Sequence, residues 1–287
     1  MIPELRRIAM TIGLLFPFLG SAGARAAAAD DTFRFAFLTD SHVATTDTVC
    51  MIAADAKTRF SRAVAEVNAR EDVAFVVFGG DATEYPKADE QSEFVELAKF
   101  TKPWYPVPGN HDIGNTFTLR LVNQWLDLGL GRGEAKREFY GFTHGNAAFF
   151  AINAFPADTK DAAAGLRATE MLRECDEFFA ANKDAAHKVI LAHPPLFIKH
   201  AGETDGYFNV PTHLRTRILE VLKRHGVKYW LSGHRHLTDQ ATDTETGITV
   251  FSQPSTAFAI GEGEKMGYAV FTVGKDGLNR VIVTIPE

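Results

Sequence analysis

Residues 73–81 read VAFVVFGGD, a run of strand-forming residues that ends in two glycines and an aspartate. β-Branched and aromatic residues are favoured in strands, and glycine permits the sharp turn that follows. The same order, in which a polar side chain comes soon after an apolar run, recurs after residues 33–39, 104–107, 188–191 and 227–231. We therefore expect a set of buried strands that each end in a polar loop.

Helical spacing appears between several of these runs, as at Phe60, Val64 and Val67. Alternating strands and helices predict an α/β fold. From Ile248 onward three further strands follow one another through glycine-containing connections, which predicts an antiparallel edge. No repeat or linker interrupts the chain, so residues 30–287 are expected to form one domain.

The composition describes a soluble globular protein. The chain has 287 residues, 46% of them hydrophobic and 23% charged, with a formal net charge of -6. These values argue against disorder, collagen and a multi-span membrane protein. A protein that holds nucleic acid mainly by its phosphates normally carries a basic surplus, so no nucleic-acid-binding surface is expected.

The first 29 residues have the pattern of a secretory signal peptide. Two arginines at 6–7 precede an apolar run at 8–19, and small residues offer cleavage after Ala26 or Ala29. The alternative is a membrane anchor, but the run is shorter than the about 20 residues that span a bilayer. We expect an exported protein, periplasmic or secreted, without a membrane span after cleavage.

The two cysteines leave one question open. Export would allow a Cys50–Cys175 disulfide, because oxidising compartments permit such bonds. Cys175 also falls on a helical stripe with Leu172 and Phe178, where a buried free thiol is equally suitable.

Polar side chains follow five of the predicted strands where each strand ends. In an open α/β sheet, ligands bind at the carboxyl ends of the strands, so these side chains are expected at one rim. They are Asp40 and His42, Asp81, Asn110 with His111 and Asp112, His193, and His234 with His236.

Two carboxylates, four histidines and one amide are ligands for Mn, Fe, Zn or Co. Seven ligands are too many for one tetrahedral ion, but they suit two divalent ions that share a bridging carboxylate. Two such ions about 3.5–4 Å apart would clamp a phosphoryl group and lower the pKa of a bound water. His111 is then spare to protonate a leaving oxygen.

In this order the blocks resemble the calcineurin-like metallophosphoesterase superfamily. The family pattern is D-x-H, G-D, G-N-H-D/E, a lone H and G-H-x-H, and the sequence matches each block between about Phe35 and Phe258. The resemblance implies a four-layer α/β/β/α sandwich with a dinuclear metal site at the strand ends. It also implies a hydrolase of phosphoric esters.

The resemblance further implies a role for each matched residue. One metal would take Asp40, His42, Asp81 and His236, and the other Asp81, Asn110, His193 and His234. A hydroxide bridging the ions would attack phosphorus, His111 would assist the leaving group, and Asp112 would orient His111. Purple acid phosphatases carry a tyrosine where this chain has Glu84, so their ferric ion and colour are not expected.

Two subgroups look most similar. The motif order resembles class III cyclic-nucleotide phosphodiesterases, whereas the segment from Tyr207 to His234 resembles calcineurin-like phosphoesterase domain-containing proteins that act as phosphomonoesterases. A phosphomonoesterase acting on a small-molecule or protein phosphate ester is therefore favoured, with a cyclic-nucleotide or other phosphodiesterase as the alternative. The sequence leaves the oligomeric state open.

Two other classes of protein compete with this interpretation. A non-catalytic metal- or phosphate-binding protein of the same fold would need the ligands but not His111. A serine hydrolase has little support, because neither Ser41 nor Ser232 lies in a G-x-S-x-G turn.

Overall fold

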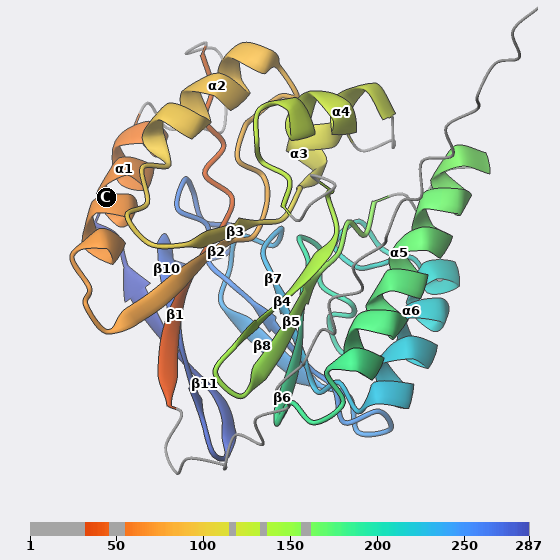
Figure 1. Ribbon diagram of the computed structural model, residues 1–287. Coiled ribbons are helices and arrows are strands. Elements are labelled where there is room, and N and C mark those ends of the chain that lie inside the picture. Colours follow the sequence, from red (N-terminus) through yellow and green to blue (C-terminus); the bar gives the residue numbers. More distant parts are fainter. Residues whose placement is uncertain (1–31, 46–54, 115–118, 133–136, 156–161, 287) are drawn as a thin grey trace, which may run out of the picture.

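The computed structural model describes residues 32–45, 55–114, 119–132, 137–155 and 162–286 (Figure 1). The predicted signal peptide and Cys50 lie outside these residues. Cys175 is a free, buried thiol. Within the described residues, no helix combines the length and apolar character needed to cross a membrane.

The strands form two sheets. The first has the order β11-β10-β1-β2-β3 and comprises β1 Phe33–Leu38, β2 Val73–Phe78, β3 Trp104–Pro106, β10 Gly267–Gly274 and β11 Gly277–Thr284. The second has the order β4-β5-β6-β7-β9-β8 and comprises β4 Tyr140–His144, β5 Ala147–Ala151, β6 His187–Leu191, β7 Tyr229–Ser232, β8 Asp239–Thr242 and β9 Thr249–Ser252.

Helices cover the outer faces of both sheets (Figure 1). The helices of the described residues are α1 Ala56–Asn68, α2 Ala88–Leu97, α3 Asn110–Ile113, α4 Leu119–Asp127, α5 Ala162–Ala181 and α6 Thr212–His225, of which the short α3 lies at the strand ends. The apolar residues of α6 fall at helical spacing on Leu214, Ile218 and Leu222, which are buried. Gly226 ends this helix in the left-handed conformation, with φ of 64°.

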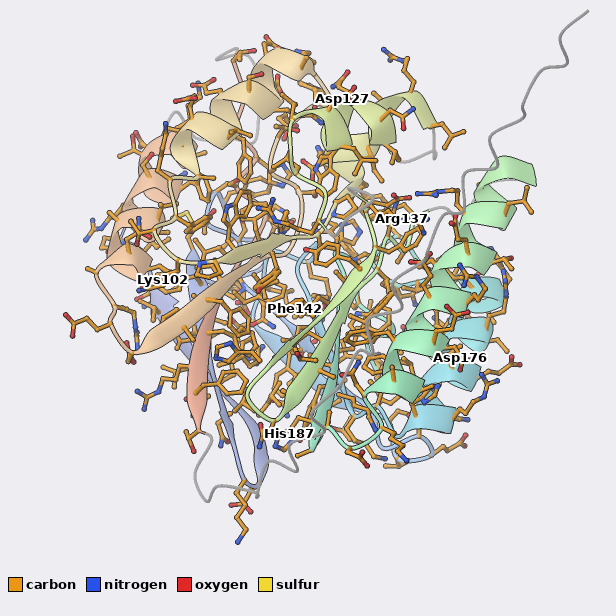
Figure 2. The ribbon with its side chains drawn as sticks, in the orientation of Figure 1. Lys102, Asp127, Arg137, Phe142, Asp176 and His187 are labelled. Atoms are coloured by element: carbon orange, nitrogen blue, oxygen red, sulfur yellow. The ribbon has the colours of Figure 1, made fainter. Side chains whose placement is uncertain are left out.

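Three apolar clusters separate the four layers. One lies between α1, α2, α4 and the first sheet, and another between the second sheet and α5 and α6. The third joins the inner faces of the sheets, where Phe35 stacks on Phe75 and Phe271 and meets Phe149 edge-on. Phe142 also lies there, stacked on Phe149 (Figure 2). The predicted α/β/β/α sandwich is confirmed.

The parallel strands set the position of the site. β1, β2 and β3 pair in parallel, as do β5, β6, β7 and β9. Parallel strands end at the same edge of their sheet, so the loops after β1, β2 and β3 meet one another, as do those after β6 and β7.

The expectation for the last three strands is only partly correct. β10 and β11 form an antiparallel hairpin at the edge of the first sheet. β9, however, lies in the second sheet and pairs in parallel with β7. Chain continuity suggested that β9 and β10 were neighbours, but the segment between them crosses from one sheet to the other.

Candidate metal centre

The five predicted loops meet at the shared rim of the two sheets. The loops after β1 and β2 are joined by hydrogen bonds from the Asp40 amide to the Gly80 carbonyl (2.9 Å) and from the His42 amide to the Asp81 carbonyl (3.1 Å). The loop after β7 is joined to the first sheet because the His234 amide donates to the Asp40 carboxylate at 3.1 Å. These bonds fix loops from both sheets against one another.

The backbone is strained at the predicted ligands. Among the described residues other than glycine, positive φ occurs only at five positions. They are Asp40 (55°), His42 (43°), Asp81 (52°), His234 (69°) and His236 (53°). Each such residue costs on the order of 1–3 kcal/mol and persists only where the surrounding structure enforces it, typically at functional sites.

The predicted ligands gather into two groups that share Asp81. Within each group the ligand atoms lie within 4.8 Å of one another, and all these residues are buried. One group is Asp40, His42, Asp81 and His236, and the other is Asp81, His193 and His234. Asn110, at the start of α3, is also buried.

Each of the four histidines has one ring nitrogen hydrogen-bonded outside the group. The bonds are His42 Nδ1 to Glu84 Oε2 (2.8 Å), His193 Nδ1 to the Gly79 carbonyl (2.7 Å), His234 Nε2 to the Tyr207 carbonyl (3.1 Å) and His236 Nδ1 to the Phe258 carbonyl (3.1 Å). Because an oxygen of this kind accepts, each outer nitrogen carries the proton in a neutral ring. The other nitrogen then presents a lone pair to the centre, the arrangement found around metal-ligating histidines.

The inward nitrogens crowd against one another and against carboxylates. His42 Nε2 lies 3.1 Å from His236 Nε2, and His236 Nε2 lies 3.1 Å from Asp40 Oδ1. His193 Nε2 lies 3.0 Å from Asp81 Oδ2 but lacks hydrogen-bonding geometry. Lone pairs and carboxylates packed this closely repel unless a cation or a proton lies between them.

Four buried side-chain atoms have no hydrogen-bond partner in the described structure: Asn110 Oδ1, Asn146 Oδ1, Asn153 Nδ2 and His193 Nε2. Orphaned polar atoms are rare in a protein interior, because each costs about 1–3 kcal/mol. Two of the four, Asn110 Oδ1 and His193 Nε2, belong to the predicted set for the second metal. The residues present therefore fit two cations that share Asp81.

The pKa values of the clustered side chains reflect the same crowding. Burial alone lowers the pKa of His193, but Asp81 and Asp40 raise it to about 9. Burial opposes the charge of Asp40, yet His236 and His193 lower the pKa of this carboxyl to about 2. Burial and the neighbouring His193 lower the pKa of His234 to about 4. The centre thus holds ionised carboxylates, as ligands for cations must be.

His111 lies at the edge of the centre, with 29% of its side chain exposed. Its amide donates to Asp81 Oδ1 at 2.9 Å, and its Nδ1 donates to the Glu84 carbonyl at 2.6 Å. Burial lowers the pKa of His111, but Asp81 and Glu84 outweigh it and raise the pKa overall. This histidine is suited to donate a proton from Nε2.

Glu84 is a functional candidate that the sequence did not reveal. Its carboxylate accepts from His42, and its carbonyl accepts from His111, so one residue holds both rings. The only sequence signal was its place three residues after Asp81.

The expected role of Asp112 is not the one observed. Asp112 Oδ2 accepts from the Gly109 amide at 2.8 Å, and Oδ1 accepts from the Thr83 amide at 3.1 Å. Its carboxylate is thus occupied by backbone donors and braces two loops, whereas the His111 ring is held by Glu84. Burial and the nearby Asp81 raise the pKa of Asp112 to about 7.

The comparisons with known proteins agree with this geometry. The fold and the two groups around Asp81 define a candidate two-metal centre. A family model described as calcineurin-like phosphoesterase matches residues 33–237, and the chain belongs to this family. The predicted superfamily is confirmed.

The chain is 30% identical over 151 residues to the serine/threonine-protein phosphatase CPPED1 of Mus musculus, and 29% identical over 185 residues to that of Rattus norvegicus. These matches cover 52% and 63% of this chain. The chain spans about half the length of these relatives, 46% and 53% respectively.

Solved structures share the fold. A dimetal phosphatase from Danio rerio has a TM-score of 0.64 at 16% identity, covering 88% of this chain and 99% of that one. GAP50 of Plasmodium, described as the anchor in the inner membrane complex, has a TM-score of 0.61 at 16% identity, covering 89% of this chain and 85% of that one.

Gly109 gives a direct test of the centre. A Cβ added there would fall on the Asp81 carboxylate and amide. We expect Gly109→Ala to fold, as judged by circular dichroism, but to retain at most one of two ions per chain, because Asp81 is shared. Metal content after dialysis measures this.

Gly165→Ala is the matched control, because a Cβ there meets nothing within 4 Å. It should keep two ions. Two tightly bound ions in Gly109→Ala would contradict the account of the centre.

Proposed function

We propose that the protein is a metal-dependent hydrolase of phosphoric esters, with phosphomonoesters as the favoured substrates. The convergence of the predicted ligands on Asp81, with His111 at their edge, is the observation that carries the proposal. The curated relatives are named protein phosphatases, which supports a monoester.

The chain's own residues supply binding and proton transfer. When bound, two cations polarise phosphoryl oxygens and lower the pKa of bound water. Asp40, His42, Asp81 and His236 would hold one ion, and Asp81, Asn110, His193 and His234 the other. His111 Nε2 would donate a proton to the departing oxygen, while the Glu84 carbonyl holds the opposite ring nitrogen.

Mn, Fe, Zn and Co all suit this set of nitrogen and oxygen ligands.

The substrate is proposed to be a small-molecule or protein phosphate ester. A cyclic-nucleotide or other phosphodiester remains the second candidate, favoured by the motif order. A non-catalytic protein of this fold is the third, and the anchor GAP50 shows that the fold occurs in a protein described by a structural role.

Export is proposed on the sequence of residues 1–29 alone. Mass spectrometry of the protein recovered from the periplasm or the medium tests this proposal, and the expected mass is that of a chain cut after Ala26 or Ala29. An exported chain that still carries these residues would contradict the cleavage.

Metal reconstitution tests the function. We expect the chelated protein to be inactive and Mn to restore turnover, with a monoester hydrolysed faster than a diester or a cyclic nucleotide. Product release from the three esters, measured side by side, gives the ranking. Full activity in metal-free protein, or no product from any ester at saturating metal, would overturn the proposal.

His111→Ala tests the proton donor. We expect kcat to fall about 100-fold or more, the typical contribution of a general acid, while metal content stays unchanged. His213→Ala, an exposed histidine on α6, is the control and should keep wild-type kcat. A wild-type rate in His111→Ala would remove His111 from the mechanism.

A further inference from the structure

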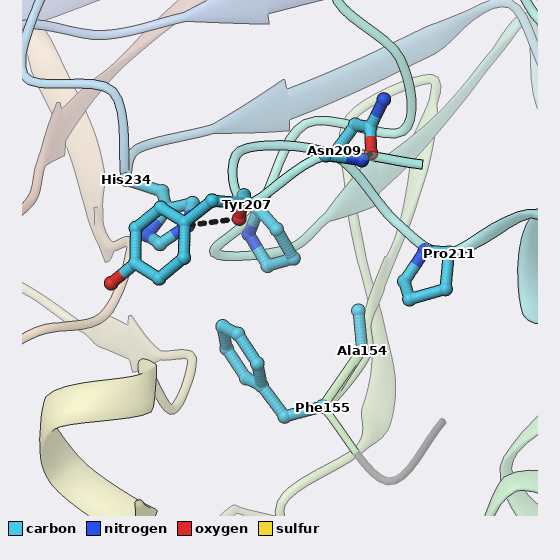
Figure 3. Close-up of a pocket in the computed structure, with 8 residues that line it drawn as sticks. Ala154, Phe155, Tyr207, Asn209, Pro211 and His234 are labelled. Carbon is cyan, nitrogen blue, oxygen red and sulfur yellow. Dashed lines mark hydrogen bonds between the residues drawn. The ribbon is translucent and has the colours of Figure 1, made fainter. Parts of the chain in front are cut away.

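A pocket of about 180 Å³ opens beside His234, on the side of the second predicted metal. Its lining residues come from the loops after β5, β6 and β7 (Figure 3). Among them are Phe155, Pro194, Gly206, Tyr207, Asn209 and His234. This lining contains no Asp, Glu, Lys or Arg side chain.

Two aromatic rings join the pocket to the metal centre. The Tyr207 ring lies 5.1 Å from that of His234, and the Phe155 ring lies 5.9 Å from His193 and 6.2 Å from His234. Figure 3 shows the Phe155 side chain pointing toward the Tyr207 and His234 rings. A group bound between Phe155 and Tyr207 would therefore be next to two predicted metal ligands.

The polar atoms of the lining are largely occupied by the protein itself. Asn209 Oδ1 accepts from the Gly206 amide at 2.8 Å, and Asn209 Nδ2 donates to Glu203 Oε1 at 2.6 Å. The Pro194 carbonyl accepts from Trp230, and the Tyr207 carbonyl from His234. A charged group that entered this pocket would lose its hydration and find no opposite charge on these residues. An apolar group has no hydrogen bonds to water to lose, so its burial there is favourable.

The loop that carries Tyr207 is held by hydrogen bonds from buried side chains. Arg215 of α6 is 1% exposed and donates to the carbonyls of Val210, at 2.9 Å, and Glu203. The Glu203 carboxylate accepts from the amides of Ile198 and Lys199, both at 2.7 Å. A wall braced in this way needs little ordering when a ligand binds, which favours affinity.

Arg235, Lys199 and His200 follow predicted metal ligands in the sequence and could hold a phosphate, but they do not line the pocket. Arg235 is ion-paired with Asp239, and Lys199 and His200 are exposed in the loop that Glu203 braces. Recognition at this position is thus apolar, and the phosphoryl group is left to the metal centre.

We propose that this pocket receives the organic group of the phosphate ester and selects flat, uncharged, aryl-type groups. The inference rests on the proposed function and adds the substrate class. Phe155 and Tyr207 are its specificity-determining residues.

Binding of two non-hydrolysable phosphonates tests the pocket without relying on turnover. Benzylphosphonate and methylphosphonate are titrated by calorimetry into the Mn-loaded protein. We expect benzylphosphonate to bind about tenfold tighter or more, because burying a phenyl group in an apolar pocket gives a preference of this size.

Variants of the lining residues test whether the preference for benzylphosphonate arises in this pocket. Phe155→Ala should reduce this preference to about twofold while leaving the affinity for methylphosphonate unchanged. Tyr207→Ala should reduce it likewise and is compared with Tyr207→Phe, because both variants remove the hydroxyl that accepts from Asn110 Nδ2 at 3.5 Å. Tyr207→Phe should keep it, since the ring and the backbone carbonyl remain. Leu166→Ala, at a side chain 72% exposed on α5, is the control and should also keep it.

Equal affinities of the two phosphonates in the wild type, or a preference that both alanine variants retain, would overturn the inference. Turnover of benzyl and ethyl phosphate separates this failure from that of the proposed function. If both esters are hydrolysed with equal KM, the hydrolase remains and the pocket assignment fails. If neither is hydrolysed but the phosphonate preference holds, the pocket assignment remains and the hydrolase fails.

Discussion

Four imidazole rings each direct one ring nitrogen toward two buried carboxylates, and the rest of the site depends on this crowding of potential metal ligands. Asp40 and Asp81 are almost fully buried, and the outward nitrogen of every ring is held by an oxygen of a neighbouring loop. A site arranged in this way is costly until cations enter it. The packed core of the sandwich offsets this unfavourable free energy and holds the loops in place.

The two sheets contribute unequally to this arrangement. The first sheet provides the carboxylates, His42 and Asn110, and the second provides the other three histidines. The phenylalanine-rich layer between the sheets fixes their spacing, and hydrogen bonds such as that from the His234 amide to Asp40 fix the loops. Left-handed backbone at five ligand positions turns the side chains inward immediately after the strands.

Most of this site could be predicted from the sequence because each ligand follows its own strand, which is a local feature. The placement of β9 could not, because pairing with β7 rather than β10 is decided by packing. Glu84 reaches His42 across 42 residues, and Asp112 is captured by the amides of Thr83 and Gly109. Such contacts depend on how the loops fold together, as does the pocket between Phe155 and Tyr207.

The most direct test of the shared centre is anomalous X-ray diffraction from crystals of the Mn-loaded protein. The account predicts two manganese peaks about 3.5–4 Å apart with the Asp81 carboxylate between them. One peak should be surrounded by Asp40, His42 and His236, and the other by Asn110, His193 and His234. A single ion, or ions bound away from Asp81, would contradict it.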